Sequence, residues 1–149
     1  MIHSADIYTD GSCNTSNGLG AWVAIILSGE EKTVLSGKVP DTTHNRMELH
    51  AVIAGINHAG KTFKSLRIYS DSQYVTGLME RREKLTAAGF ITSKGTEMRN
   101  ADLVKEFYAL SERIELTFIK VKAHQKKGLD VNFNIEADKL VRKIMREGI

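Results

Sequence analysis

The chain has 149 residues, of which 42% are hydrophobic and 26% are charged. This is the size and composition of one globular domain, and we expect a single domain over residues 1–149. The 21 lysine and arginine residues exceed the 18 aspartate and glutamate residues by three, a balance that permits a polyanionic partner without requiring one. A single cysteine excludes a disulfide framework. No signal peptide or membrane-length apolar run is visible, so we expect a cytoplasmic protein without a membrane partner.

The first part of the chain has the pattern of short strands separated by turns. Three segments of six or seven residues are rich in apolar, aromatic and β-branched side chains, and glycine, serine and asparagine are frequent between them. A glycine-rich loop is expected over residues 11–20. Strands are expected over residues 5–10, 21–27 and 32–37.

From about residue 43 the apolar residues recur at helical spacing, with Thr42 or Thr43 as the N-cap and Gly60 at the end. Ser72 can cap a second helix that continues through Met79, after which the chain is charged and then broken by Gly89. The later pattern predicts a strand over residues 66–71, a helix over 102–112, a strand over 116–121, a loop and a helix over 134–146. The whole chain therefore reads as an α/β domain.

Two of the expected strands end in an aspartate. A hairpin and one returning helix separate these strands, so they run parallel and bring Asp10 and Asp71 to the same carboxyl edge of the sheet. Ligands of open α/β sheets usually bind at this edge. Glu48 and Asp138 fall in the opening turns of helices that leave it. Four acids that are scattered in the sequence are thus expected to converge.

Each acid also has a purely structural explanation. Asp10 and Asp71 precede glycine and serine, as aspartates in turns commonly do, and Glu48 and Asp138 suit the N-terminal ends of their helices. Together, however, four packed carboxylates repel one another unless cations lie between them. Mg²⁺ prefers oxygen ligands, and a pair of such ions supports phosphodiester cleavage.

Five motifs in the chain resemble those of ribonuclease HI, in the same order and with similar spacing. The resemblance extends over residues 6–146, and although each motif is weak alone, the ordered set is highly specific. The motifs are YTDGS at 8–12, NRMEL at 45–49, SDSQYV at 70–75, VKAH at 121–124 and NIEADKL at 134–140. The resemblance implies a ribonuclease H-like fold, in which helices flank a five-stranded mixed sheet. Its first three strands are antiparallel, and strands 1, 4 and 5 are parallel.

The resemblance also implies an activity: endonucleolytic hydrolysis of the RNA strand of an RNA–DNA hybrid, giving 5′-phosphate and 3′-hydroxyl products. Carried over by position, Asp10 bridges two Mg²⁺ ions, for which Mn²⁺ can substitute. Glu48 and Asp71 help to hold the ion on the leaving-group side, and Asp138 holds the ion that activates water. His124 matches a mobile histidine that assists proton transfer or product release; its alternative is a surface histidine.

Substrate contacts follow from the same resemblance. Recognition of the ribose 2′-hydroxyl separates RNA from DNA, and the backbone of residues 11–13, with Glu48 and Gln73, matches the family positions that provide it. Asn45 and Gln73 match minor-groove contacts, and Thr43 and Asn100 match positions that grip a DNA-strand phosphate. Arg81, Arg82 and Lys84 belong to a basic handle that is diluted here by glutamates. The substrate-binding residues expected in this way are Gly11, Ser12, Cys13, Thr43, Asn45, Gln73, Arg81, Arg82, Lys84 and Asn100.

These substrate contacts have structural alternatives. Asn45 and Gln73 are also suited to turn or cap hydrogen bonds, and Cys13 to simple packing. The lysines of the segment after the fifth strand either meet phosphates or form a solvated loop. Ile135 stands where the family often has a glutamate, and the loop that carries His124 is longer than usual. The four other histidines match no motif and are interpreted as structural or surface residues.

Two other functions remain compatible with the sequence. A nuclease that cuts DNA strands can share this fold, but the intact segment at residues 11–13 and the basic handle favour the ribonuclease. A non-catalytic hybrid-binding module is the third reading, although a binder gains nothing from four acids that face phosphates. We therefore expect a metal-dependent endoribonuclease that acts on RNA–DNA hybrids as a monomer, with no obligate protein partner and no separate hybrid-binding domain.

Overall fold

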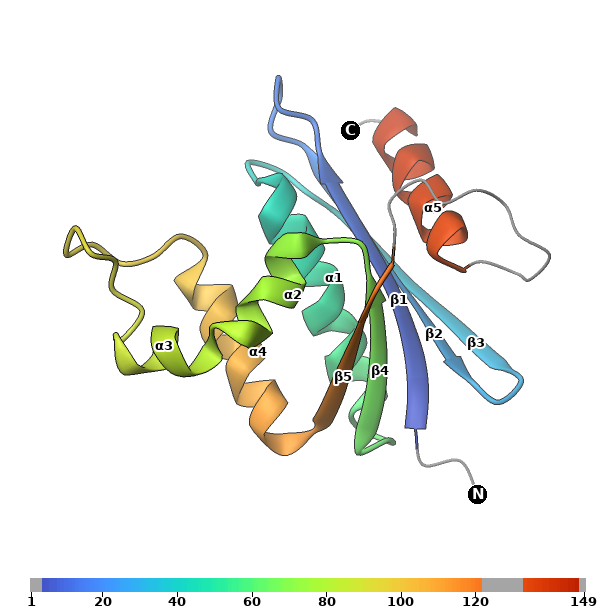
Figure 1. The fold of residues 1–149 in the computed structure, drawn as a ribbon. Coiled ribbons are helices and arrows are strands. Elements are labelled where there is room, and N and C mark those ends of the chain that lie inside the picture. The colour runs from blue at the N-terminus through green and yellow to red at the C-terminus, as the bar shows by residue number, and fades with distance from the viewer. Residues whose placement is uncertain (1–3, 122–132, 148–149) are drawn as a thin grey trace.

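A five-stranded mixed sheet forms the centre of the protein in a computed structural model, which describes residues 4–121 and 133–147 (Figure 1). The strand order is β3-β2-β1-β4-β5. β1 is antiparallel to β2 and β2 to β3, whereas β1 is parallel to β4 and β4 to β5. This arrangement confirms the predicted fold class. The strands are β1 (Ser4–Cys13), β2 (Gly20–Ser28), β3 (Glu31–Val39), β4 (Ser65–Ser70) and β5 (Glu115–Lys120).

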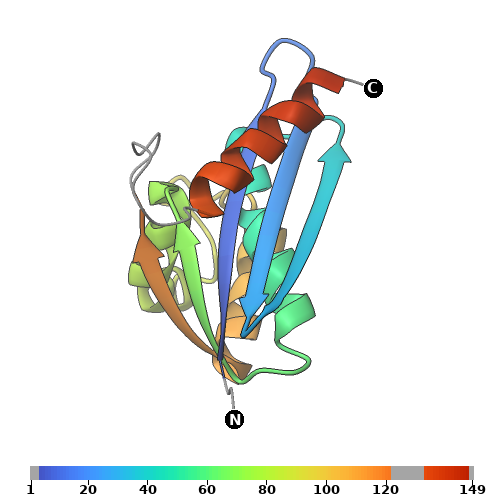
Figure 2. The same ribbon diagram turned by 90° about the vertical axis from the view of Figure 1, so that its right-hand side faces the viewer.

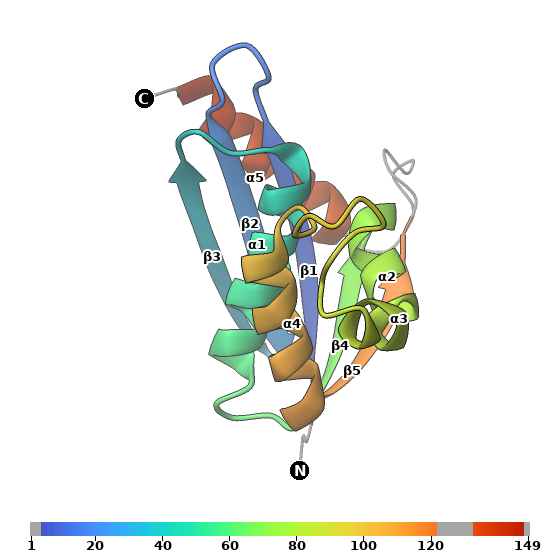
Figure 3. The ribbon, with the colours of Figure 1, turned by 90° about the vertical axis from the view of Figure 1, so that its left-hand side faces the viewer.

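Helices cover both faces of this sheet. Figure 2 shows α5 lying across β1 and β2 on one face, and Figure 3 shows the other helices on the opposite face. The helices are α1 (His44–Ala59), α2 (Gln73–Glu80), α3 (Arg82–Ala87), α4 (Ala101–Arg113) and α5 (Phe133–Glu147). Among the described residues, none of these helices has both the length and the apolar character that a membrane span requires.

Strand β2 is buried on both faces, which explains its unbroken apolar run. Val23 and Ile25 pack with Ala137 and Val141 of α5. Ala24 and Ile26 belong to the larger core on the other side, with α1, α2 and α4. Alternate side chains of a strand point to opposite faces, so a strand between two layers of helices must be apolar at every position.

The first helical turns lie at the carboxyl edge of the sheet because side-chain caps fix where the helices begin. Thr43 Oγ1 accepts a hydrogen bond from Arg46 N at 3.3 Å and starts α1. Ser72 Oγ accepts one from Val75 N at 3.2 Å and starts α2. Both caps are hydroxyl side chains that satisfy otherwise unpaired amides. They set Glu48 in the second turn of α1 and Gln73 at the first position of α2.

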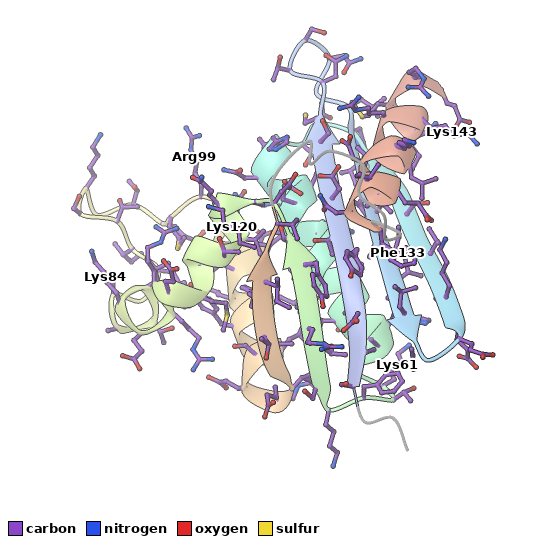
Figure 4. The ribbon with its side chains drawn as sticks, turned by 45° about the vertical axis from the view of Figure 1, so that its right-hand side comes forward. Lys61, Lys84, Arg99, Lys120, Phe133 and Lys143 are labelled. Carbon is purple, nitrogen blue, oxygen red and sulfur yellow. The ribbon has the colours of Figure 1, made fainter. Side chains whose placement is uncertain are left out.

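Helix α5 is attached to the sheet by its first residue. Phe133 lies against the sheet (Figure 4), with its ring 5.5 Å from the ring of Tyr8. Lys32 Nζ lies 5.5 Å from the same ring and pairs with Glu136 Oε2 at 2.6 Å. These contacts join β1 and β3 to the turn of α5 that precedes Asp138.

The structure differs from the sequence-based elements at two places. β1 continues to Cys13 instead of ending at Asp10, because the glycine-rich segment pairs with the beginning of β2, from Gly11 opposite Trp22 to Cys13 opposite Gly20. Helix α3 was not expected, since its charged sequence has no buried residue and therefore no apolar periodicity. The loop expected over residues 122–133 lies outside the described residues, except for Phe133, which is the first residue of α5.

Candidate active site

Three carboxylates meet at the carboxyl edge of the sheet, each from a different element. Asp10 is on β1, Glu48 is on α1 and Asp71 immediately follows β4. One oxygen of each carboxylate lies within 4.8 Å of the others. The parallel pairing of β1 with β4 and the cap of α1 together produce this approach. Carboxylate oxygens at such separations are a donor set that suits Mg²⁺.

Glu48 provides the test of whether a cation fits here. The residue is only 3% exposed, and its Oε1 is buried without a hydrogen-bond partner. Its Oε2 lies 3.7 Å from Nε2 of His44, one turn earlier on α1. A buried acceptor without a partner is costly. The cluster therefore has an unsatisfied carboxyl oxygen that a bound cation would satisfy.

The carboxylates also raise each other's pKa. Burial, followed by the charges of Asp71 and Asp138, raises the pKa of Asp10 to about 7. Burial, followed by the charge of Asp10, raises the pKa of Glu48 to about 9. The backbone amide of Gly11 opposes both changes. The protein scaffold alone thus disfavours the ionised form of both acids, and pKa values perturbed in this way are typical of functional sites.

Asp138 joins the cluster from the opposite layer of the fold. Its carboxyl group lies close enough to Asp10 to raise the pKa of Asp10, and its Oδ2 lies 3.1 Å from Nη2 of Arg142, one turn later on α5. The Asp138 side chain is 34% exposed, so it is more open to solvent than Asp10 or Glu48. It therefore borders the three-carboxylate set on the solvent side.

Gly11 is required by the close approach of β1 to α1. A Cβ atom at this position would lie 2.4 Å from the carbonyl carbon of Met47 and 2.6 Å from the amide nitrogen of Glu48. Backbone atoms on a capped helix cannot move aside as a flexible side chain would. The absence of a side chain at residue 11 thus allows Asp10 and Glu48 to share one site.

The carboxylates lie in a groove of about 840 Å³. Several residues expected to contact substrate border it, and Gly11, Ser12, Asn45 and Gln73 are among them. Cys13 is the last residue of β1, and its Sγ contacts the carbonyl oxygen of Thr42 at 3.2 Å. The complete set of lining residues is Asp10, Gly11, Ser12, Asn14, His44, Asn45, Glu48, Asp71, Ser72, Gln73, Tyr74, Asp138, Val141, Arg142, Met145 and Arg146.

A second, smaller hollow of about 390 Å³ adjoins the start of α1. Thr43, His44, Asn45, Arg99 and Asn100 line it. His44 and Asn45 border both hollows. The two residues expected to grip a phosphate, Thr43 and Asn100, are therefore brought together although 56 positions separate them in the chain.

The basic residues of the expected handle lie beyond the groove. Arg81 ends α2, Arg82 and Lys84 are on α3, and Arg82 Nη1 donates to Ser111 Oγ at 2.9 Å. Figure 4 shows Lys84 on α3 and Arg99 on the segment before α4, both at the end of the molecule away from α5. His124 lies outside the described residues.

The sequence interpretation missed the three basic residues that line the groove. His44 was interpreted as a structural or surface histidine, but it contacts Glu48; its spacing of four residues from Glu48 on a helix was the available signal. Arg142 and Arg146 were not assigned a role, yet they border the groove beside Asp138. Their spacing of four and eight residues from Asp138 places them on the same face of α5.

Fold and site together define a class: an α/β protein whose mixed sheet gathers carboxylates in an open groove suited to divalent cations. The model of the RNase H family matches residues 3–146. The chain is 37% identical to a ribonuclease H of Thermoanaerobacter sp. (strain X514), over 93% of this chain and 88% of that protein. It is 36% identical to a ribonuclease H of Chlorobium luteolum over 99% of both chains, and 38% identical to one of a Wolbachia species from Drosophila simulans over 92% of both. The chain belongs to the RNase H family.

Proposed function

We propose that this protein is an endoribonuclease that hydrolyses the RNA strand of RNA–DNA hybrids with two divalent cations, Mg²⁺ or Mn²⁺, to give 5′-phosphate and 3′-hydroxyl ends. The observation that carries the proposal is the carboxylate cluster, in which Glu48 buries an oxygen without a partner. Membership of the RNase H family supports the choice of an RNA–DNA hybrid as the substrate.

The chain's own residues divide the work by position. Asp10 is central, since it approaches Glu48 and Asp71 on one side and Asp138 on the other. In our proposal Asp10 would contribute to holding both cations, Glu48 and Asp71 would help to hold one, and Asp138 would hold the other. Two bound cations would stabilise the attacking water and the leaving oxygen. We assign His124 to proton transfer or product release, as the resemblance implies.

The groove also supplies groups that can distinguish RNA from DNA. Gly11 and Ser12 present backbone to the groove beside the carboxylates, and Gln73 and Asn45 border it. Amide and backbone groups of this kind hydrogen-bond ribose hydroxyls and base edges. The open shape of the groove suits a nucleic-acid strand, and the basic residues of α2 and α3 would extend the contact along its phosphates.

Cleavage of an end-labelled RNA–DNA hybrid, with and without Mg²⁺, tests the proposal against matched RNA–RNA and DNA–DNA duplexes. We expect metal-dependent cutting of the RNA strand of the hybrid alone. Asp10→Asn should lower the rate by about 10³-fold or more while hybrid binding survives. Asp6→Asn, on the same strand but paired with Arg67, is the matched control and should cut normally.

Two results would contradict the proposal. Cleavage of duplex DNA in preference to the hybrid would indicate a DNA-cutting nuclease on this fold. Tight hybrid binding without any cutting in Mg²⁺ or Mn²⁺ would indicate a binding module.

A further inference from the structure

Asn100 has an unusual conformation for the residue that precedes a helix. It precedes α4 with a left-handed backbone, φ 62° and ψ 22°, and its side chain makes no capping hydrogen bond. Thr43 and Ser72, at the same position before α1 and α2, do cap their helices. Asparagine is a favoured capping residue, so its side chain is engaged here in another task. Strained backbone of this kind persists only where the surroundings impose it.

The Asn100 amide is held by two side chains from other helices. Its Oδ1 accepts a hydrogen bond from Arg46 Nη1 of α1 at 3.2 Å, and its Nδ2 donates to Tyr74 Oη of α2 at 3.1 Å. Arg46 is itself fixed by Asp102 in the first turn of α4, through Nη1 to Oδ1 at 3.0 Å and Nη2 to Oδ2 at 2.9 Å. Helices α1, α2 and α4 are thus joined around one amide group.

The hydrogen-bonding partners determine which way round the Asn100 amide lies, with its oxygen and its NH₂ group on opposite sides. A guanidinium group can only donate hydrogen bonds, so Asn100 must present its oxygen to Arg46. The NH₂ group is then directed to Tyr74, and because it carries two N–H bonds, one remains for a ligand in the hollow that Asn100 lines. Arg46 is not among the residues that line this hollow. Its influence on a ligand there must act through Asn100.

We propose that Arg46 is a positioning residue, which with Asp102 holds the Asn100 amide so that its NH₂ group donates to a phosphate of the DNA strand. Thr43, Arg99 and the amide of Asn100 are then a set of donors around one anion. The inference rests on the proposed function, because it takes the hybrid as the substrate. It adds that phosphate binding depends on the ion pair of Arg46 with Asp102, which joins α1 to α4 and lies outside the hollow. We call this ion pair the clamp.

Steady-state cleavage of an RNA–DNA hybrid by a set of full-length variants tests the clamp. Arg46→Ala should raise KM about 10-fold, the cost of one hydrogen bond to a charged group, and leave kcat within about 2-fold. Asn100→Gly removes the amide but suits the left-handed backbone, so it should raise KM equally without unfolding the protein. The double variant should be no worse than Asn100→Gly alone, since Arg46 acts through the residue already removed.

Arg67→Ala is the matched control. Arg67 also forms a two-bond ion pair, with Asp6 through Nε at 2.6 Å and Nη2 at 3.2 Å, but it lies on β4 and not at the hollow. It should leave KM unchanged. Arg46→Lys, which keeps the charge but cannot reproduce the forked pairing, should recover only part of the loss.

Three outcomes would overturn the proposal that Arg46 positions Asn100. Arg46→Ala could match the control, the double variant could show the product of the two single effects, or Arg46→Lys could restore KM fully, which would indicate a need for charge alone. Each of these requires a wild-type protein that cuts the hybrid. If the wild type does not cut it, the proposed function itself fails, and the two failures remain distinguishable.

Discussion

At the scale of single residues, two carboxyl groups of the site are difficult to ionise in the folded protein. Glu48 and Asp10 have pKa values raised to about 9 and about 7, in each case chiefly by burial. In the unfolded chain both titrate near 4. Between pH 4 and these raised pKa values, each carboxyl group of the folded, metal-free protein either keeps its proton or carries a charge that its neighbours repel. Both states are less favourable than ionisation in the unfolded chain, so both cost stability.

The sign of the pH effect follows directly. A carboxyl group with a raised pKa binds more protons in the folded state, so the free energy of unfolding falls as the pH rises from about 4 to about 9. Glu48→Gln cannot ionise and should be more stable than the wild type by about 1–3 kcal/mol at pH 8 without metal. The advantage should disappear at pH 4. Urea unfolding in EDTA at both pH values measures the difference.

Glu112→Gln is the matched control, because it makes the same change of side chain at an exposed position of α4. If it stabilises the protein at pH 8 as much as Glu48→Gln does, the effect reflects net charge and not the buried cluster.

Gly11 sets the spacing of the site, and its replacement makes a second residue-scale prediction. In Gly11→Ala the new methyl group would lie 2.4 Å from a backbone atom of Met47, and either β1 or α1 must shift. We expect a loss of about 2–4 kcal/mol in the free energy of unfolding. Gly77→Ala, inside α2 where no atom lies within 4 Å of the new Cβ, should instead gain about 0.5–1 kcal/mol. A lower free energy of unfolding in Gly77→Ala, with no loss in Gly11→Ala, would contradict this reasoning.

At the scale of elements, regular periodicity was readable, whereas the full extent of the strand pairing was not. The helix that begins after Thr43 and the one that begins after Ser72 were predicted with their caps, because capping chemistry is local. The extension of β1 through Gly11 was missed, since it depends on pairing with a distant strand. Helix α3 was missed because it buries no side chain. The left-handed Asn100 has no sequence signal beyond its residue type.

The contact between α2 and α4 gives the prediction at this scale. Tyr108 Oη donates to the carbonyl oxygen of Leu78 at 2.6 Å, and the tyrosine is only 5% exposed. Tyr108→Phe keeps the ring packing but leaves a buried carbonyl without this donor. We expect a loss of about 1–2 kcal/mol with an unchanged denaturant m-value, measured by urea unfolding. A changed m-value would mean that α2 had separated from α4 and that more than one hydrogen bond was lost.

At the scale of the whole molecule, topology brings the acids together. Parallel pairing of β1 with β4 puts Asp10 and Asp71 at one edge, and this could be deduced from the order of strands and helices. The approach of Glu48 follows from the same crossover and the cap of α1. His44, Arg142 and Arg146 were missed, although their helical spacing from Glu48 and Asp138 was readable. Their contact with the groove depends also on how closely α1 and α5 pack against the sheet, which a single sequence does not display.

Because the packed acids repel one another, the cluster should bind a divalent cation favourably. This predicts how the stability of the whole protein responds to Mg²⁺. A cation that binds only the folded state stabilises it by RT ln(1 + [L]/Kd). With a Kd of about 1 mM, 10 mM Mg²⁺ contributes about 1.4 kcal/mol, or a rise of about 3–5 °C in Tm for a domain of this size. Asp71→Asn removes a proposed ligand and should lose most of this rise.

Ionic strength is the competing explanation for any such rise, because salt also screens repelling charges. NaCl at matched ionic strength separates the two effects. Screening acts on all exposed charges alike, whereas Glu48 and Asp10 are buried and are screened little. The wild type should therefore gain more from Mg²⁺ than from NaCl, and Asp71→Asn should gain equally from both. Equal gains in the wild type would mean that the cluster binds no cation in this range. The raised pKa values of Asp10 and Glu48 would then reflect buried acids that remain protonated, and the proposed function would lose its chemical basis.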